Sequence, residues 1–509
     1  MKLIPRLLLA AALGTATAAW AAGPAHAADN PDPGPGPDIE GEPPPDSITG
    51  PAEADPAAPN FQNPAFGPRY VLEDIVVRGN RKTQTALIMD ALHLRAGDEV
   101  GASDARVEAA RYRLLALGYF LDARLSLQRG SKRGGAVLLV EVEERGTLII
   151  NDIFLSSSRA TAFWGGLDAS ESNFLGRGIN LGAGFVASTT PRVPEARAGL
   201  GLRAHISSPP LGGGDITLSA TGLFNNGSEL FRSSGADSDG RPADFVAVGT
   251  RRTGGILGVG KTLTRSVRVF LDARQEFVDA TLPAGRTQTL PDGSTQTINF
   301  KIAAGSSRVA SLIGSVDYDT RSDPVLPRNG VHLLVSVEAA APGGPGSYGF
   351  VKTLGQASLY QRMPFGHVLG LHLLGGAIGG NAPYFDQFFV GDLNLLLPRR
   401  ALGINFATLP SRNLLGAGMA GHRYDDYTGR LLIDYAVPII RRSRFIYGGD
   451  LFVAVGVLGL ASSADFHRSG GLTWGTTPID LTGDLGLRLD TYIGVFTASV
   501  ANILNRSPF

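Results

Sequence analysis

The chain has 509 residues, no net formal charge and a mean hydropathy of +0.06. That length can hold several ordinary domains, or one large barrel with accessory parts. Glycine occurs 67 times, which favours many short strands and turns, and the absence of cysteine excludes a disulfide-stabilised fold.

The N-terminus has the pattern of a secretory signal peptide. Lys2 and Arg6 precede an apolar run at 7–19, and Ala25-His26-Ala27 offers a cleavage site between small residues. The run is too short for a membrane-spanning helix, which needs about 20 apolar residues, and no later window reaches that length. We therefore expect residues 1–27 to be a cleaved signal peptide.

Residues 28–68 are rich in proline and acidic residues and contain neither lysine nor arginine. So little apolar surface cannot offset the entropy cost of ordering, and we expect a disordered linker. It could attract a basic partner, but a plain tether is the simpler interpretation.

Residues 69–146 have the pattern of a compact α+β domain. A first strand ends at the turn dipeptide Gly79-Asn80, and a short helix is expected to begin near Thr83. A second helix has Ser103 as its expected N-cap. Its apolar face is formed by Val107, Ala110, Leu114 and Leu117. Two further strands complete the order strand–helix–helix–strand–strand.

Residues 147–509 contain many segments in which apolar and polar residues alternate. In one of them, apolar residues at 331, 333, 335 and 337 alternate with His332, Ser336 and Glu338. A soluble sandwich would also alternate, but here the polar positions are often arginine or aspartate and the strands are long. A sheet in lipid must close on itself with apolar residues outward. The sequence therefore predicts a mainly β fold: a C-terminal transmembrane antiparallel β-barrel of about 16 strands, preceded by one small α+β domain.

The stretch SVDYDTRSDPVLPRNG at 315–330 concentrates charge at one point. Asp317, Asp319, Arg321 and Asp323 precede the turn residues Asn329-Gly330. The aspartates miss the spacing of a calcium loop, and no histidine or nucleophile is evident near them for acid–base chemistry. We interpret the stretch as a sharp turn between strands, with Arg321 paired to the flanking aspartates.

Several motifs resemble known families. The segments RGN, LRAGDEV, LGYF and VEVEE, in that order within 69–146, resemble a POTRA domain. The stretch at 315–330 resembles the YDTR-x-x-P-x-x-P-x-x-G turn of the BamA/TamA-type family of outer-membrane protein assembly factors. ESNFLGRGINLGAGF resembles an early barrel turn of that family, with Asn173, Gly176, Arg177 and Gly178. FFVGDLNLLLPRRALGINF at 388–406, followed by GRLLIDYAVPI, resembles the long loop that precedes its EYxxP strand.

That long loop departs from the family pattern. The resemblance implies an Arg-Gly-aromatic tripeptide whose arginine reaches into the lumen towards an aspartate on a later strand. The matching place here is Arg400-Ala401-Leu402, and Ala454 stands where the family has the aspartate. Arg399 is an equal candidate for the arginine, and Arg423 is a further one. Arg400 would then meet another lumenal acid, such as Asp434 or Asp490.

Signatures of enzymes are missing from the sequence. The eight histidines are scattered, and neither a phosphate-binding loop nor a Gly-x-Ser-x-Gly elbow occurs. No serine and histidine occupy neighbouring outward positions of the predicted strands. We therefore expect no enzymatic activity, no cofactor and no metal site. The basic residues are interleaved with apolar ones, so no nucleic-acid partner is expected.

The resemblance implies a factor that binds unfolded outer-membrane or secreted client proteins and inserts them into the outer membrane. Membrane lipid and periplasmic chaperones or accessory lipoproteins would be its further partners. An exposed sheet edge can receive a client strand by backbone hydrogen bonding. One such edge is expected at 121–128, with Leu121, Leu125 and Leu127, and another at the seam between the first and last barrel strands. The seam candidates are Ile149 and Ile153 in Leu148–Ser156, and Phe496 and Val500 in Ile493–Ile503.

Two alternatives stay open at this point. A two-partner-secretion transporter would export one dedicated protein through the pore, although such transporters usually carry two POTRA units and a plug helix. A passive porin or receptor would need no edge-binding domain.

Overall fold

The computed structural model describes residues 69–101, 104–158, 160–211, 215–233, 245–284, 286–289, 294–322, 326–344, 346–393, 400–406, 424–440, 445–466 and 479–504. The expected signal peptide and linker lie outside these residues, as do Ser103, Asp323, Arg399 and Arg423. The described chain divides into two compact units between Glu144 and Arg145. No helix in the described part is long and apolar enough to cross a membrane.

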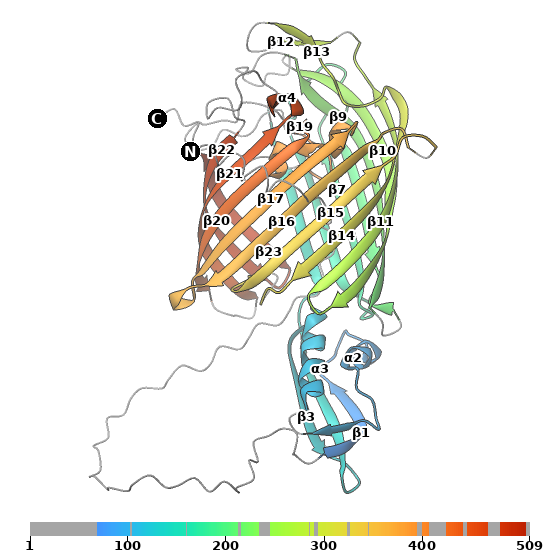
Figure 1. The fold of residues 1–509 in the computed structure, drawn as a ribbon, viewed down its shortest axis with the longest axis vertical. Helices are drawn as coiled ribbons and strands as arrows, with labels where there is room; N and C mark the ends of the chain where they lie inside the picture. Colours follow the sequence, from blue (N-terminus) through green and yellow to red (C-terminus); the bar gives the residue numbers. More distant parts are fainter. Residues whose placement is uncertain are drawn as a thin grey trace, which may run out of the picture. The chain divides into compact units, whose positions relative to one another are not determined.

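The smaller unit is a four-stranded sheet with two helices (Figure 1). Its elements are β1 (Arg69–Arg78), α2 (Thr85–Leu92), β2 (Glu99–Gly101), α3 (Ala105–Ala116), β3 (Phe120–Arg129) and β4 (Gly135–Glu144). The strands lie in the order β2-β1-β4-β3, and β1 and β4 are parallel. The expected strands and helices are present. The short β2, which the sequence pattern missed, is only three residues long and shows no alternation.

Polar side chains fix the ends of the elements in this unit. Asp104 caps α3 by accepting a hydrogen bond from the backbone N–H of Arg106, and the Arg106 side chain beside it lowers the pKa of Asp104 to about 2. Glu144 accepts hydrogen bonds from the backbone N–H groups of Arg81, Lys82 and Thr83, which ties the β1–α2 connection to the end of β4.

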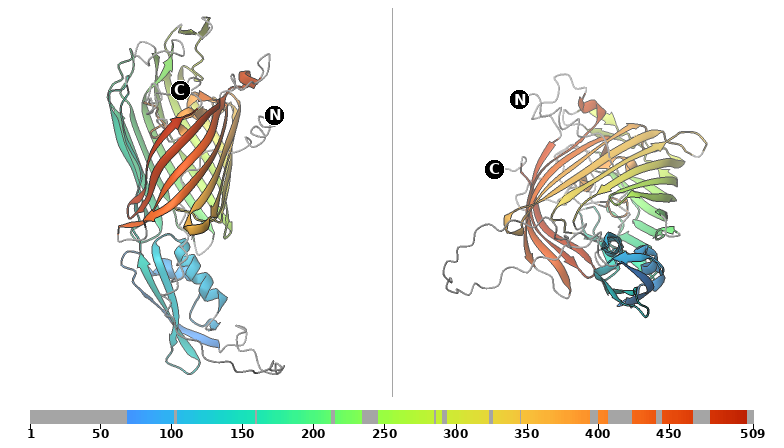
Figure 2. Two further views of the ribbon diagram at one scale, coloured as in Figure 1. Left: turned by 90° about the vertical axis from the view of Figure 1, so that its left-hand side faces the viewer. Right: turned by 60° about the horizontal axis from the view of Figure 1, so that its bottom comes forward.

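The larger unit is a barrel of antiparallel strands arranged around a lumen (Figure 2). Fifteen strands form its sheet in the described residues. They are β5 (Leu148–Ser156), β6 (Trp164–Phe174), β7 (Ile179–Ser188), β8 (Leu200–Ser207), β9 (Ile216–Arg232), β10 (Phe245–Thr264), β11 (Val267–Thr281), β14 (Gly305–Asp319), β15 (Gly330–Ala340), β16 (Phe350–Arg362), β17 (Val368–Gly380), β20 (Tyr427–Ile440), β21 (Ile446–Ala461), β22 (Ile479–Thr491) and β23 (Gly494–Ile503). The predicted fold class, a mainly β barrel after a small α+β region, is confirmed.

The two faces of the barrel wall differ as the alternation predicts. Outward side chains are apolar and exposed, for example Leu271 at 60% and Leu312 at 57%. Inward positions hold buried charged groups, among them Arg274 and Glu338. An exposed apolar belt around a polar interior is what a barrel sheet needs to stand in lipid.

The described sheet has 15 strands, close to the expected number of about 16. Every neighbouring pair in the described sheet is antiparallel, and the sheet has 15 strands, so β5 and β23 run in the same direction. An even number of strands would have brought the two end strands together antiparallel.

The connections at the two ends of the barrel are unequal. At the end where β5 begins, called here the proximal end, the strands are joined mainly by short turns, such as 175–178 and 492–493. At the opposite, distal end the connections are longer, and the one from β17 to β20 spans 381–426. The small elements of the connections are β12 (Thr287–Thr289), β13 (Thr295–Thr297), η4 (Pro364–Gly366), η5 (Tyr384–Asp386), β18 (Phe388–Phe389), η6 (Val390–Asp392), β19 (Tyr424–Asp425) and α4 (Ser463–Phe466).

Candidate functional sites: the seam and the lumenal loop

The sheet of the barrel ends at β5 on one side and β23 on the other. In the described residues these strands meet only where both begin. The backbone N–H of Ile150 donates to the carbonyl oxygen of Ile493 at 2.8 Å. Gly494 permits this approach, since a Cβ at that position would lie 2.8 Å from the carbonyl oxygen of Ile150. Above this contact no ladder joins β5 to β23 in the described residues, so each presents a sheet edge.

The predicted seam residues lie on these two edge strands. Ile153 is 55% exposed on β5, and Val500 is 56% exposed on β23. Phe496 and Val500 stand opposite Leu489 and Leu485 of β22, whose apolar side chains face outward. Ile149 lies near the contact at the base of the seam, 3.4 Å from the position of a Cβ on Gly494. The seam is therefore apolar outside and has unpaired backbone along most of its length.

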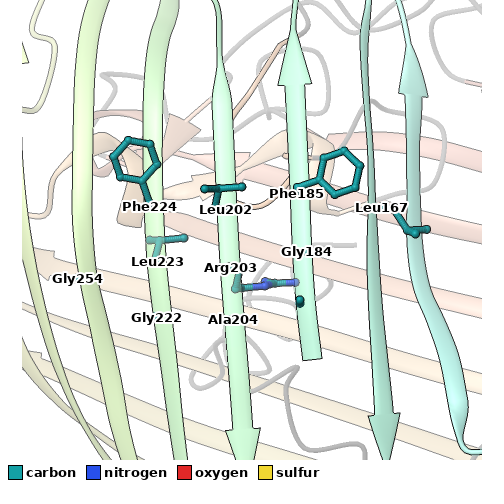
Figure 3. Close-up of a pocket in the computed structure, with 11 residues that line it drawn as sticks. Leu167, Gly184, Phe185, Leu202, Arg203, Ala204, Gly222, Leu223, Phe224 and Gly254 are labelled. Atoms are coloured by element: carbon teal, nitrogen blue, oxygen red, sulfur yellow. The ribbon is translucent and has the colours of Figure 1, made fainter. Parts of the chain in front are cut away.

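A shallow hollow of about 540 Å³ lies in the barrel wall close to β5 (Figure 3). Leu167, Phe185, Leu202 and Phe224 come from the adjoining strands β6 to β9 and form one row. The next outward row consists of small residues, including Ala183, Ala204 and Gly222, which leaves the space. The lining is mostly apolar, and its position makes it part of the lipid-facing surface.

The connection between β17 and β20 enters the lumen and is fixed there by buried charges. Its residues 381–406, as far as they are described, are called the lumenal loop below. Asp386 accepts from Arg274 of β11 at 2.9 Å. Arg274 also binds Glu276 and Glu338, each at 2.8 Å, and Glu276 binds Arg252 of β10. The Lys352 ammonium of β16 donates to the backbone carbonyl of Asp386 at 2.7 Å.

These six side chains form a buried network in which the charges balance. The cations are Arg252, Arg274 and Lys352, and the carboxylates are Glu276, Glu338 and Asp386. A buried charge is tolerated only when it is paired and hydrogen-bonded. The one member contributed by the loop is Asp386, so the loop completes a network that four strands prepare.

Arg400 does not have the expected partner. It binds Asp392 of the same loop through Nε at 2.9 Å, and it donates to the carbonyl oxygen of Phe385 at 2.8 Å. Asp434 instead contacts His372, and Asp490 lies 4.0 Å from Arg145. The expectation that Arg400 reaches Asp434 or Asp490 is therefore wrong. The contacts of Arg400 lie within the loop, whereas Asp386 forms an ion pair between the loop and the wall.

The other end of the lumenal loop packs on the opposite part of the wall. Leu402 and Gly403 form a tight turn with positive φ, and the carbonyl oxygen of Leu402 accepts from Asn225 of β9 at 2.9 Å. Phe406 stacks on Trp164 of β6, with ring centroids 5.7 Å apart. The loop thus spans the lumen from β11 and β16 to β6 and β9.

Aromatic side chains fill the distal part of the lumen around this loop. Tyr384 lies edge-on to Phe231 and to Tyr424, each at 5.5 Å between centroids. The buried cluster also contains Tyr348, Phe350, Phe385, Phe388 and Phe389. The described loop and cluster therefore lie together in the distal part of the lumen.

The stretch 315–330 contains the end of β14 and the start of β15, and the connection between them is described at 320–322 and 326–329. Arg321 pairs with Asp319 at 2.7 Å. Asp317 points into the lumen, where it binds Arg268 at 2.6 Å and the Nε2 atom of His332 at 2.9 Å. The expectation that no histidine lies near these aspartates is therefore wrong, because the hairpin register places His332 opposite Asp319.

The early turn lies at the proximal end, between β6 and β7. Asn173 accepts a hydrogen bond from the backbone N–H of Gly178 at 2.8 Å through its side-chain oxygen. Gly176 and Gly178 both have positive φ, at 72° and 69°, and Arg177 lies between them. These residues thus build a tight turn.

In the smaller unit β3 is an edge strand. It pairs with β4 on one side, and in the described sheet its other side carries no strand. Leu125 and Leu127 pack partly against the core, while Leu121 lies at a register shift between Phe120 and Asp122. This edge is the one expected from the sequence.

Comparison with known proteins identifies the barrel. Residues 173–396 match the model of the Omp85 superfamily domain. This part of the barrel, which includes β7 to β17, is similar to the Omp85 superfamily domain. The relationship to the BamA/TamA-type family that the motifs indicated is thereby confirmed. No curated protein matches the chain in sequence.

Two solved structures share the fold of this protein. The first is BamA from Haemophilus ducreyi lacking POTRA domains 1–3, which is 13% identical, with 86% of this chain and 81% of that chain covered and a TM-score of 0.50. The second is CdiB from Acinetobacter baumannii, which is 12% identical, with 86% of this chain and 71% of that chain covered and a TM-score of 0.50. At these identities the likeness concerns the fold.

Proposed function

We propose that this Omp85 barrel inserts unfolded client strands into the outer membrane through the seam between β5 and β23. The observation that carries the proposal is the open seam: in the described residues one backbone hydrogen bond, from Ile150 to Ile493, joins the two edge strands at their base. Each unpaired backbone group costs several kcal/mol in hydrocarbon. A client strand that pairs with these edges removes that cost for itself and for the barrel.

The direction of the edge strands favours this use. Because β5 and β23 run in the same direction, a single strand that runs the opposite way is antiparallel to both. It can therefore form a ladder on each side, whereas β5 and β23 could pair with each other only in parallel. The free energy for insertion would come from the folding of the client.

The smaller unit would serve this function as a periplasmic POTRA domain. Its edge strand β3, with Leu121, Leu125 and Leu127, can accept an extended client segment by backbone hydrogen bonding. Outer-membrane barrels have short periplasmic turns and longer extracellular loops. The short turns at the proximal end support an orientation in which that end faces the periplasm.

A two-partner-secretion transporter is the second candidate, and the fold similarity to CdiB favours it. Export through the lumen would require the loop to leave, which means breaking the contact of Asp386 with Arg274. Insertion at the seam leaves that contact intact. A passive porin is disfavoured because the loop and its aromatic cluster occupy the lumen.

A disulfide across the seam tests the proposal, and the chain has no cysteine of its own to interfere. The variant I150C/I493C links the two residues whose backbones already touch. Leu333 and Ala357, directly opposite each other on β15 and β16, provide the control pair L333C/A357C. Each variant would replace the native protein in its own host, with and without reductant.

We expect the seam-locked protein to fail in maintaining several outer-membrane barrel proteins, measured by quantitative proteomics, and to recover under reductant. The control disulfide should have no effect. Loss of one protein from the culture supernatant, with an unchanged membrane, would instead support the secretion transporter. A locked seam that sustains both fractions would refute insertion through it.

A further inference from the structure

Three polar side chains on adjoining strands form a chain of hydrogen bonds in the proximal half of the lumen. Ser358 of β16 stands directly opposite His372 of β17, and its Oγ lies 3.0 Å from the Nδ1 atom of His372. The Nε2 atom of the same ring lies 2.5 Å from Oδ1 of Asp434 on β20. Neither the seam nor the lumenal loop uses these residues.

The bonding pattern assigns the protons. An ionised carboxylate only accepts hydrogen bonds, so Nε2 of His372 carries the proton that Asp434 receives. Nδ1 is then the bare nitrogen, and the hydroxyl of Ser358 must donate to it. This is the arrangement of nucleophile, base and orienting carboxylate that activates a serine. In the usual serine triad, Nε2 of the histidine faces the serine and Nδ1 faces the carboxylate. Here Nδ1 faces Ser358 and Nε2 faces Asp434, but the proton still passes from the serine hydroxyl to the histidine ring.

The neighbouring residues leave room for this arrangement. Gly370 stands opposite Asp434, and a Cβ there would lie 2.1 Å from Oδ1 of Asp434 and 2.9 Å from Nε2 of His372. Asp434 is 4% exposed, whereas Ser358 and His372 are half-buried and face the lumen. The carboxylate is thus held inside the wall while the serine can be reached.

A group that could stabilise an oxyanion lies beside the serine. The ring of Tyr360 packs edge-on against His372 at 5.4 Å, and its hydroxyl interacts with Ser358. A tyrosine hydroxyl is a donor that enzymes use where negative charge develops.

We propose that Ser358 is a nucleophile that hydrolyses a small, water-soluble carboxylic ester in the lumen, with His372 as its base and Asp434 orienting the ring. The Ser358 oxygen forms a bond to the carbonyl carbon while its proton moves to Nδ1 of His372. The ester C–O bond breaks, and the departing alkoxide takes that proton and leaves as an alcohol. Water then attacks the acyl-serine with the same base, releasing the acid and restoring the hydroxyl.

The test uses the full-length protein folded in detergent micelles, with folding checked by the heat-dependent shift of its gel mobility. A fluorophosphonate probe should label the folded protein, and peptide mass spectrometry should place the label on Ser358. Hydrolysis of p-nitrophenyl acetate should be measurable. S358A should abolish the label and lower hydrolysis at least about 100-fold, and H372N should slow labelling by about 100-fold or more.

Two further variants separate chemistry from structure. D434N should slow labelling and alter its pH profile, because the wrong tautomer of His372 is then held. Ser336, another lumenal serine, stands opposite Leu354, and S336A should label like the parent protein. The proposal is overturned if the folded parent takes up no probe, if the label survives S358A, or if H372N labels at the parental rate.

Discussion

Replacing Asp386 by asparagine is expected to release the lumenal loop from the barrel wall. The substitution keeps the size of the side chain but removes one of the three carboxylates that balance Arg252, Arg274 and Lys352. Breaking a buried ion pair by removing one partner costs about 3–5 kcal/mol. Glu276 and Glu338 still neutralise part of the charge on Arg274, so we expect the lower end of that range.

A cost of about 3 kcal/mol raises the population with the loop displaced by about 100-fold. Because the loop lies inside the lumen, D386N should increase single-channel conductance in planar bilayers and speed proteolysis within the loop. D392N is the matched control: Asp392 is 36% exposed and pairs with Arg400 inside the loop. Such partly exposed pairs contribute about 0–1 kcal/mol. If D386N conducts and resists protease like the parent protein, the network does not hold the loop.

Three further predictions concern the backbone and the smaller unit. G79A should destabilise the smaller unit by about 1–3 kcal/mol, measured by hydrogen exchange of its amides, because φ is 89° and a Cβ would lie 2.0 Å from the Val142 carbonyl oxygen. Unchanged exchange would show that the β1–α2 connection can shift. G330A should lower the temperature of the heat-dependent mobility shift of the barrel, since φ is 111° and a Cβ would lie 2.4 Å from the Thr320 carbonyl oxygen; an equal transition temperature would contradict this. The pKa of Glu144 is below its ordinary value of 4.5, because hydrogen bonds from backbone N–H groups, that of Thr83 foremost, outweigh the effect of burial. Its contribution is therefore complete above the ordinary pKa and is lost as the pH falls through the lower folded value, so amide protection at 81–83 should fall in that acidic range. E144Q should lack this pH dependence, and a parallel loss in E144Q would point to another group.

The sequence predicts the barrel well because each wall strand is selected for the same alternation, as at 331–338, where His332, Ser336 and Glu338 face inward. The number of strands is harder to predict from the sequence, because one strand more or fewer changes an even number into an odd one. The loop partners are not predictable from the motif: Arg400 lies close to Asp392 along the chain, while Asp386 meets Arg274, which is 112 positions earlier.

The pairing register of the barrel strands explains the contacts that the sequence did not predict. Ser358 and His372 are 14 positions apart, and His372 and Asp434 are 62 apart, so no local motif reveals them. They come together because β16, β17 and β20 are neighbours in the sheet, and a shift of one residue would turn them to the lipid side. Asp317 and His332 are likewise brought together by the pairing of β14 with β15, so no linear motif reveals their contact.

The charge network also constrains the order in which this barrel can mature. The groups that receive Asp386 come from β10, β11, β15 and β16, and they are brought into one place only after those strands have paired. Before these strands have paired, the loop has no site to enter. The wall contributes three cations but two carboxylates to the network, so its charge is not balanced until Asp386 arrives. Loop docking is therefore a late step that reports a correctly registered wall. In a barrel whose strands have paired in the wrong register, the loop would stay outside the lumen, where proteases could cut it.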